Sequence, residues 1–297
     1  MKPAPFEYYA PASVGEALSH LAEHGYDAKV LAGGQSLIPM MNFRLAQPSV
    51  LVDLNRIESL SFIQPGEDGG LSLGAMTRHN QVEHSPVVAE RAPLIYEAMP
   101  KIATTQIRSR GTFGGSIAHA DPSAELAAVS VALDGRFRLL GTNRERWVPA
   151  NEFFVGMFTT LLEPDELFVE ARFPPLLPRT GWSLVEIARR PHDFALVGVA
   201  VVVTLDELGQ CQQARLVFLS VGDGPVEAHQ AAGVLIDQRP SAEAIQEAAE
   251  IAASTDIDPG ADIHASAEYR RHLAKVLARR ALERAFERAE GASLHDN

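Results

Sequence analysis

Hydrophobic residues recur with two different spacings along the N-terminal part of the chain, and each spacing predicts a type of element. Apolar residues at helical spacing follow the capping-box sequence Ser13-Val14-Gly15-Glu16, and Gly25 supplies a stop signal. A run with strand character then ends at Gly33-Gly34, a short helical segment follows, and Val50-Leu51-Val52-Asp53-Leu54 predicts a second strand. This order predicts a small βαβ unit whose glycine loop lies at the carboxyl end of its first strand, where open α/β sheets bind ligands.

After this unit the pattern changes to short strands separated by turns, with helical segments between them. Strands are expected at residues 71–75 and 168–173, and residues 137–140 are expected to pair with residues 146–148 as a hairpin. Helical spacing appears at residues 87–98.

A further helix is expected to begin at Asp121-Pro122 and to end at Asp134-Gly135. Aspartate is a favourable N-cap, and proline suits the first helical position. The helix would follow directly from a second glycine-rich loop.

The last third of the chain is set apart by Pro174-Pro175-Leu176-Leu177-Pro178, a stiff connection that predicts a domain boundary. Strand-like runs at residues 182–187, 194–205 and 213–221 predict a three-stranded antiparallel sheet. A long amphipathic helix is expected at residues 265–290, with its arginines and glutamates on a solvated face.

Composition limits the classes of function. The chain has 297 residues, enough for two domains with their own cores, and its formal net charge of −12 disfavours nucleic acid or an anionic membrane as the main partner. Cys211 is the only cysteine, so this chain forms no internal disulfide and holds no cysteine-ligated iron–sulfur cluster. The N-terminus shows no signal segment, and no apolar run is long enough to cross a bilayer, so we expect a cytoplasmic protein.

The first glycine loop, Ala32-Gly33-Gly34-Gln35-Ser36, is the main candidate for binding. Two glycines let the backbone turn sharply and approach a ligand, and free amides before the following helix favour a phosphate. Gln35 and Ser36 offer further donors, while an ordinary turn is the alternative. The loop matches neither G-x-G-x-x-G nor the lysine-containing P-loop, which disfavours nucleoside triphosphate hydrolysis.

A second loop of similar sequence, Gly111-Thr112-Phe113-Gly114-Gly115-Ser116, strengthens the binding hypothesis because two loops can hold one extended ligand from both sides. Asp121 is then either a helix cap alone or a carboxylate that accepts a ligand hydroxyl.

No other group of residues predicts a metal-binding or catalytic site. His79, His84 and His119 are far apart in the sequence and have no carboxylate or cysteine at ligand spacing, so no metal site is expected. No Ser-His-Asp or Cys-His motif is recognised, and no catalytic residue is assigned.

These motifs together resemble the FAD-binding medium subunit of the molybdenum hydroxylases, the family of carbon monoxide dehydrogenase and xanthine dehydrogenase. The resemblance extends over essentially the whole chain, and the order and spacing of the motifs support it. Besides the two glycine loops, its motifs are Pro5-Phe6-Glu7-Tyr8, Leu73-Gly74-Ala75-Met76-Thr77, Ala118-His119-Ala120-Asp121-Pro122, Leu161-Leu162-Glu163-Pro164-Asp165-Glu166 and Arg189-Arg190-Pro191-His192-Asp193-Phe194-Ala195.

The resemblance implies an α+β fold. A two-subdomain FAD-binding domain of the PCMH type would occupy residues 1–176, divided at about residue 58 into subdomains 1–58 and 59–176. Residues 177–297 would form the C-terminal flavoprotein domain with its three-stranded sheet and helices.

The resemblance also implies which residues bind FAD, without a covalent bond. Both glycine loops would hold the diphosphate, and Asp193 or Phe194 would lie at the isoalloxazine. Lys29 would assist at the phosphates or else be a solvated strand charge, and Leu161 or Leu162 would pack on the flavin or adenine or else lie in the core. The full implied set is Lys29, Ala32, Gly33, Gly34, Gln35, Ser36, Leu37, Thr112, Phe113, Gly114, Gly115, Ser116, Asp121, Leu161, Leu162, Asp193 and Phe194.

The function implied by the resemblance is electron transfer within an oxidoreductase complex. A large molybdopterin subunit would oxidise the substrate, a small subunit with [2Fe–2S] clusters would pass electrons on, and this chain would deliver them to an external acceptor. The partners would form a heterotrimer or its dimer, (LMS)2, and the lone cysteine agrees because the clusters must lie elsewhere. Two alternatives stay open: a self-contained FAD-dependent oxidase or reductase, and a nucleotide-binding module without redox chemistry.

Overall fold

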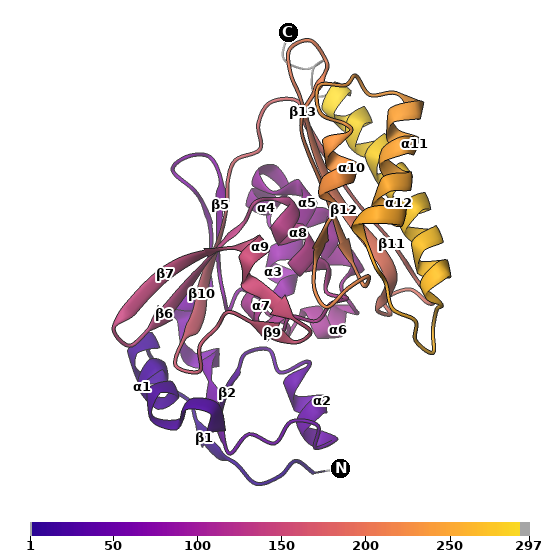
Figure 1. The fold of residues 1–297 in the computed structure, drawn as a ribbon. Helices are drawn as coiled ribbons and strands as arrows, with labels where there is room; N and C mark the ends of the chain where they lie inside the picture. Colours follow the sequence, from indigo (N-terminus) through magenta and orange to yellow (C-terminus); the bar gives the residue numbers. More distant parts are fainter. Residues whose placement is uncertain (1, 292–297) are drawn as a thin grey trace.

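The structure is a computed structural model that describes residues 2–291. Figure 1 shows three successive parts: an N-terminal unit with α1 and α2, a middle part built on a twisted antiparallel sheet and a group of helices, and a C-terminal sheet covered by long helices. Among the described residues, no helix combines the length and apolar character that crossing a lipid bilayer demands.

The N-terminal unit is a three-stranded parallel sheet of order β1-β3-β2, with Leu31 paired to Asp53 at the carboxyl ends of β2 and β3. The expected βαβ arrangement is therefore present. Its elements are β1 (Glu7–Tyr9), α1 (Val14–His24), η1 (Gly25–Asp27), β2 (Ala28–Leu31), α2 (Leu37–Asn42), β3 (Val50–Asp53), η2 (Leu54–Arg56) and η3 (Glu58–Leu60).

Local sequence determines where α1 begins and ends. The Ser13 hydroxyl accepts a hydrogen bond from Glu16 N at 3.2 Å, as the capping-box sequence predicts, while the Glu16 carboxylate accepts one from Ala12 N rather than from Ser13 N. Gly25 ends the helix with a φ of 49°, a conformation that glycine adopts without a Cβ clash. The buried face of α1 packs Leu18 and Leu21 against the sheet.

The middle part is a five-stranded antiparallel sheet of order β4-β5-β10-β6-β7 with helices packed on it. The predicted hairpin is confirmed, with Phe137 opposite Val148. The strands are β4 (Ile63–Pro65), β5 (Leu71–Gly74), β6 (Arg136–Gly141), β7 (Arg144–Pro149) and β10 (Leu167–Phe173), with a small second sheet of β8 (Phe154–Gly156) and β9 (Thr159–Thr160); the helices are α3 (His79–Glu83), α4 (Pro86–Arg91), α5 (Pro93–Ala98), η4 (Met99–Lys101), α6 (Thr105–Arg108), α7 (Phe113–His119), α8 (Glu125–Ala132) and α9 (Ala150–Phe153).

The expected start of α8 was wrong. The helix begins at Glu125, and Asp121 instead closes a turn in which its carboxylate accepts a hydrogen bond from Ser123 N at 2.9 Å. The short aspartate side chain satisfies a nearby amide equally well in a turn or at a helix end, so the sequence alone did not distinguish the two.

The C-terminal part is an antiparallel sheet of order β11-β12-β13-β14, in which the three expected strands are joined by a short fourth strand. Helices α10 to α12 cover one face, and α5 and α8 of the middle part lie against the other (Figure 1). The elements are β11 (Thr180–Ala188), β12 (Ala195–Leu205), β13 (Cys211–Leu219), β14 (Val226–Glu227), α10 (His229–Gly233), α11 (Ala242–Ile251), η5 (Ala252–Asp256) and α12 (Ala267–Gly291).

Helix α12 packs closely on β11, and both elements are held to the middle part. Gly181 on β11 lets α12 come close, because a Cβ there would lie 1.8 Å from the Ala285 carbonyl oxygen. From α5, the Glu97 carboxylate accepts hydrogen bonds from Leu184 N at 3.0 Å and from Arg288 Nη1 at 2.6 Å. Helix α12 and strand β11 are thereby fixed to the middle part.

Candidate functional site

The loop between β2 and α2 presents a row of free backbone amides. Within the described part of the chain, the N–H groups of residues 33–37 donate no hydrogen bond, while the Gly34 and Ser36 carbonyls accept bonds from Ile38 N and Met40 N. The Ser36 hydroxyl does not cap α2 either. Gly34 has a φ of +72°, which favours glycine. Unpaired amides at a surface are donors available to an anion.

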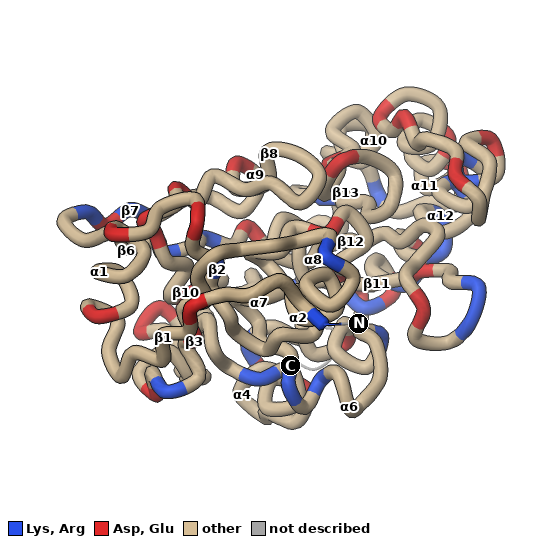
Figure 2. Tube along the Cα trace, turned by 90° about the horizontal axis from the view of Figure 1, so that it is seen from below, with Lys and Arg blue, Asp and Glu red and all other residues tan. Residues whose placement is uncertain are grey.

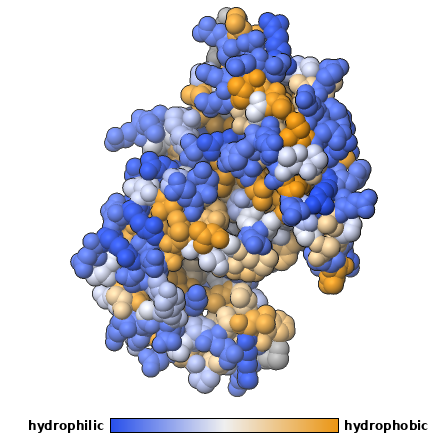
Figure 3. Space-filling view, viewed as in Figure 1, coloured by the Kyte–Doolittle hydropathy of each residue, from blue (hydrophilic) through white to orange (hydrophobic). Residues whose placement is uncertain are grey.

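Gly33, Gly34 and Gln35 of this loop line a cavity of about 370 Å³ at the carboxyl ends of β2 and β3. Figure 3 shows the molecule hollowed on this face, between the N-terminal unit and the elements above it. Besides the loop residues, the lining includes Asp53, Asn55 and the exposed Arg110, whose guanidinium forms no ion pair with any described residue. The cavity thus combines free N–H donors with an unpaired cation, although the chain as a whole is acidic and Figure 2 shows both charges interleaved along it.

A polar network holds the end of β3. The Asp53 carboxylate accepts hydrogen bonds from the Tyr8 hydroxyl at 2.5 Å and from Asn55 N at 2.8 Å. The Asn55 side chain in turn donates from Nδ2 to the Ala32 carbonyl at 2.9 Å, so the end of β3 positions the start of the first glycine loop.

Arg78 connects this network to the second glycine loop. Its Nη2 donates to Asn55 Oδ1 at 2.5 Å, and its Nη1 donates to the Arg110 carbonyl. Burial is the main cause that lowers the pKa of the Arg78 guanidinium. Asn55 and Arg78 therefore link the Ala32 carbonyl of the first glycine loop to the Arg110 carbonyl, directly before the second loop.

The two loops also touch directly. A Cβ on Gly33 would lie 2.4 Å from the Arg110 carbonyl oxygen and 2.8 Å from Gly111 Cα. No real Cβ approaches backbone atoms so closely, so only glycine fits at this position without moving one of the loops.

The second glycine loop was expected to bind the ligand with free amides, as the first loop was. The amides of residues 113–116 are instead bonded within the protein. Gly115 N donates to the Thr112 hydroxyl at 3.1 Å, and Ser116 N donates to the Thr112 carbonyl. Phe113 N and Gly114 N are bonded to the carbonyls of Thr77 and Ala75. Thr77 and Ala75 are distant from the loop in sequence, which is why the loop sequence alone did not show that Phe113 N and Gly114 N are bonded. The second loop braces the first instead.

A buried histidine packs against the first residue of the second loop. His79 is 5% exposed, and a Cβ on Gly111 would lie 2.9 Å from its Nδ1. Burial lowers the pKa of His79 to about 4, so the ring is neutral near pH 7.

The remaining predicted residues lie apart from this cavity. Lys29 is exposed on β2 and does not line it. Asp121 follows the C-terminal end of α7, where Ala120 O accepts a hydrogen bond from Phe158 N at 3.0 Å. Helix α7 spans seven residues, roughly 10 Å at 1.5 Å per residue, so its two ends separate the two groups.

The other predicted residues lie on two further segments. Leu161 and Leu162 are partly buried and pack against the middle core directly after the β8–β9 hairpin. Asp193 and Phe194 form the exposed turn between β11 and β12, and Phe194 is 73% exposed. Ser220 connects this turn with the Asp121 segment, because its hydroxyl lies 2.7 Å from Ala195 O and 2.8 Å from Ser123 Oγ.

An acidic pair lies between α8 and β11. Burial, together with the charge of Glu186, raises the pKa of Glu125 to about 8, and burial also raises the pKa of Glu186. Within the described residues Glu186 Oε2 is buried without a hydrogen-bond partner. Neither residue was predicted from the sequence, because their proximity depends on the packing of α8 on the C-terminal sheet.

The positions of Asp53, Asn55, Arg78 and Arg110 at the site were not predicted from the sequence either. A signal was available for the first two, since polar residues that follow a buried strand in a βαβ unit lie at the ligand-binding edge of the sheet. Arg78 and Arg110 carried no such signal.

Comparisons with known proteins match both halves of the chain. The family model described as the FAD binding domain in molybdopterin dehydrogenase matches residues 4–176, and the model described as the CO dehydrogenase flavoprotein C-terminal domain matches residues 182–285.

Individual relatives are similar over nearly their whole length. The 6-hydroxypseudooxynicotine dehydrogenase complex subunit alpha of Paenarthrobacter nicotinovorans is 42% identical, covering 97% of each chain. A chain of the carbon monoxide dehydrogenase structure from Hydrogenophaga pseudoflava is 41% identical with a TM-score of 0.93, covering 97% of this chain and 99% of that one. A chain of quinoline 2-oxidoreductase from Pseudomonas putida 86 has a TM-score of 0.91 at 36% identity, covering 98% and 99%.

Proposed function

This chain belongs to the family of FAD-binding medium subunits of the molybdenum hydroxylases, and from that premise we propose that it holds FAD between the [2Fe–2S] clusters of a small subunit and an external electron acceptor. It is thus the flavoprotein component of an oxidoreductase. A large molybdopterin subunit would oxidise the substrate.

The observation that carries the proposal is the row of five free amides at residues 33–37 beside the cavity. A diphosphate needs several donors at close range, and backbone N–H groups supply them without a side chain in the way. Gly33 and Gly34 leave the space that a Cβ would fill, and Arg110 adds a positive charge. The residues therefore fit the diphosphate of FAD.

The other end of the ligand would lie near the far end of α7. Ser220 links the Asp121 segment to the turn of Asp193 and Phe194, and the Leu161-Leu162 pair follows β9, which contacts α7. We propose that the leucines pack on the flavin, that Phe194 covers one face of the isoalloxazine, and that Asp121 accepts a ligand hydroxyl. FAD supplies the redox chemistry when bound, and the chain contributes binding, orientation and a fixed electrostatic setting.

The need for partners follows from the cysteine count. Cys211 is buried on β13, and burial raises the pKa of its thiol to about 12, so it is a poor ligand for iron. The clusters must therefore be carried by another subunit. We propose a heterotrimer of large, medium and small subunits, paired as (LMS)2.

Removal and restoration of FAD in the assembled complex tests the proposal. After FAD is stripped, substrate should still reduce the iron–sulfur clusters, seen by electron paramagnetic resonance, while reduction of the external acceptor stops. Added FAD should restore it. If acceptor reduction persists at full rate without FAD, the proposed position of this chain in the electron path is wrong.

A separate experiment on the isolated chain tests the main alternative. The isolated chain loaded with FAD should show no steady turnover with small organic donors, because the substrate is oxidised on the large subunit. Steady turnover would identify a self-contained flavin oxidase or reductase.

A further inference from the structure

The second half of α1 carries three potential metal ligands on one face. His20, Glu23 and His24 stand at positions i, i+3 and i+4, a spacing that places side chains over successive turns of the same helix face. We propose that this H-x-x-E-H segment binds one divalent transition-metal ion of the zinc class, at a site separate from the FAD cavity.

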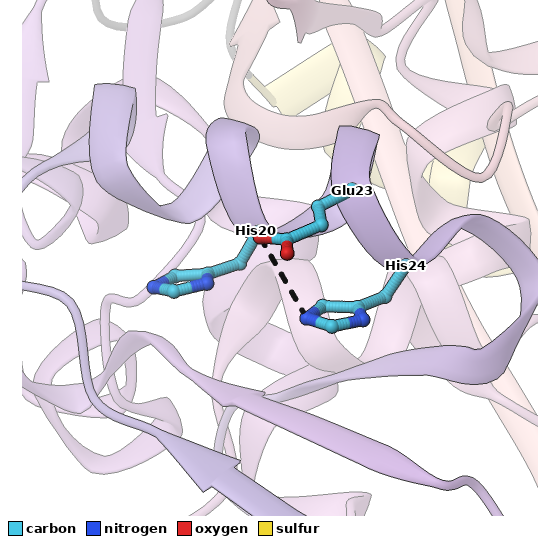
Figure 4. Close-up of side chains that lie close together, drawn as sticks. All are labelled: His20, Glu23 and His24. Atoms are coloured by element: carbon cyan, nitrogen blue, oxygen red, sulfur yellow. Dashed lines mark ion pairs between the residues drawn. The ribbon is translucent and has the colours of Figure 1, made fainter.

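The donor atoms converge and lack other partners. One ligand atom from each of the three side chains lies within 4.8 Å of the others, and His24 Nε2 is 3.9 Å from Glu23 Oε2. His20 Nδ1 and His24 Nε2 are both buried without a hydrogen-bond partner among the described residues. Figure 4 shows a nitrogen of each ring facing the other ring beside the Glu23 carboxylate. Two unsatisfied imidazole nitrogens facing each other are costly unless something binds between them.

Tyr9 of β1 holds the rings in this arrangement. Its ring stacks on His20, with centroids 4.1 Å apart, and also lies 5.6 Å from the His24 ring. The two imidazoles are nearly parallel, with an interplanar angle of 10°. The stack restricts the orientation of the rings, as supporting groups do around metal-bound histidines.

The local charge also favours a cation. The Glu23 carboxylate lies beside the imidazoles, and the Tyr9 hydroxyl donates to a second carboxylate, that of Glu7, at 2.9 Å. A bound divalent ion would offset this negative charge.

The ligand set favours a zinc-class ion over calcium or magnesium. Imidazole nitrogens suit Zn²⁺, Cu²⁺ and Ni²⁺, whereas Ca²⁺ and Mg²⁺ require oxygen ligands. Metal–ligand bonds of about 2.0–2.2 Å require the three side chains to move slightly closer together. Glu23 can do so because its side chain is 70% exposed. Three protein ligands leave a fourth position for water.

The site is distinct from the cavity at the glycine loop. Helix α1 ends before β2 begins, and the glycine loop follows β2, whose four residues extend roughly 13 Å. Metal binding is therefore tested independently of FAD binding.

Zn²⁺ titration of the full-length, tag-free chain after chelator treatment tests the proposal. Calorimetry should show one ion per chain, and zinc should raise the unfolding temperature. His20→Gln and His24→Gln should each weaken zinc binding at least about ten-fold. The control His272→Gln, an exposed histidine on α12, should leave the affinity unchanged.

Each outcome decides the proposal. Equal unfolding temperatures of the variants and the parent chain in chelator would show that the fold is retained. If either variant fails to fold, the parent chain with Co²⁺ provides the decision, since bound cobalt should show ligand-field absorption of nitrogen coordination. The proposal is wrong if zinc does not bind stoichiometrically, if both glutamine variants bind it as well as the parent, or if cobalt shows only its hexa-aquo spectrum.

Discussion

Replacing Gly33 by alanine perturbs the contact between the two glycine loops without removing any polar group. The new Cβ would lie 2.4 Å from the Arg110 carbonyl oxygen and 2.8 Å from Gly111 Cα, and both are backbone atoms that cannot rotate away. The Arg110 carbonyl is also held by Arg78. One loop must move, and the free amides of residues 33–37 move with it.

The expected loss of FAD affinity or stability in Gly33→Ala follows from the cost of overpacking. An extra carbon in a well-packed site costs about 1–3 kcal/mol. If the free chain relaxes by separating the loops, binding must restore their contact, and FAD affinity falls roughly 5- to 150-fold at 1.4 kcal/mol per factor of ten. If the loops cannot separate, the same cost appears in the free energy of unfolding. The two losses together should therefore amount to about 1–3 kcal/mol.

Fluorescence titration of the FAD-free chain with FAD measures the first loss, and urea unfolding without FAD measures the second. Gly15→Ala is a matched control, because its Cβ would meet no atom within 4 Å and it lies in α1 of the same unit. The control should keep its FAD affinity and gain up to about 1 kcal/mol of stability from helix propensity. An unchanged affinity and stability in Gly33→Ala would refute the reasoning about the loop contact.

Three further predictions concern the middle and C-terminal parts. The pKa of Glu125 is raised from 4.5 to about 8 in the folded chain, so the unfolded chain loses this proton first as pH rises. Stability should then decrease between about pH 4.5 and 8 by at most about 1.4 kcal/mol per pH unit from this group, and Glu125→Gln should flatten that dependence in urea unfolding at several pH values; a parallel pH profile in the variant would contradict the assignment. Glu97→Ala removes the acceptor of Leu184 N and leaves Arg288 Nη1 with the Trp182 carbonyl alone, which should lower the free energy of unfolding by about 1–3 kcal/mol. A loss no larger than that of an exposed substitution such as Glu207→Ala would show that the Glu97 contact adds no stability. Cys211 should resist thiol reagents in the folded chain, because it is 1% exposed and burial raises the pKa of its thiol to about 12. Rapid labelling without denaturant, followed by mass spectrometry, would contradict this.

Sequence patterns predicted those elements that short-range signals determine. The βαβ unit, the hairpin of residues 136–149 and the long strands of the C-terminal sheet follow from hydrophobic periodicity and turn residues. The fourth strand of that sheet has two residues, too few to show a period.

Features that depend on distant residues were not predictable in this way. In the second glycine loop, Phe113 N and Gly114 N are occupied because Thr77 and Ala75 lie against them, and nothing within residues 111–116 indicates that. The bridge from Asn55 through Arg78 to the Arg110 carbonyl joins three separated segments. The role of the second loop as a brace therefore emerged only from the packing.

The histidines on α1 show a different shortfall. His20, Glu23 and His24 carry their spacing in the sequence, but the prediction of no metal site considered only His79, His84 and His119. Their convergence depends on side-chain orientation, which the stacking of Tyr9 on His20 determines.

Hydrogen exchange of the first glycine loop, with and without FAD, tests the central claim most directly. The amides of residues 33–37 have no protein partner among the described residues and should exchange quickly in the FAD-free chain. Bound FAD should slow the exchange of a peptide that covers this loop, while the amides of residues 113–116, already bonded within the protein, should change little. FAD binding at full stoichiometry with no added protection of residues 33–37 would contradict the account.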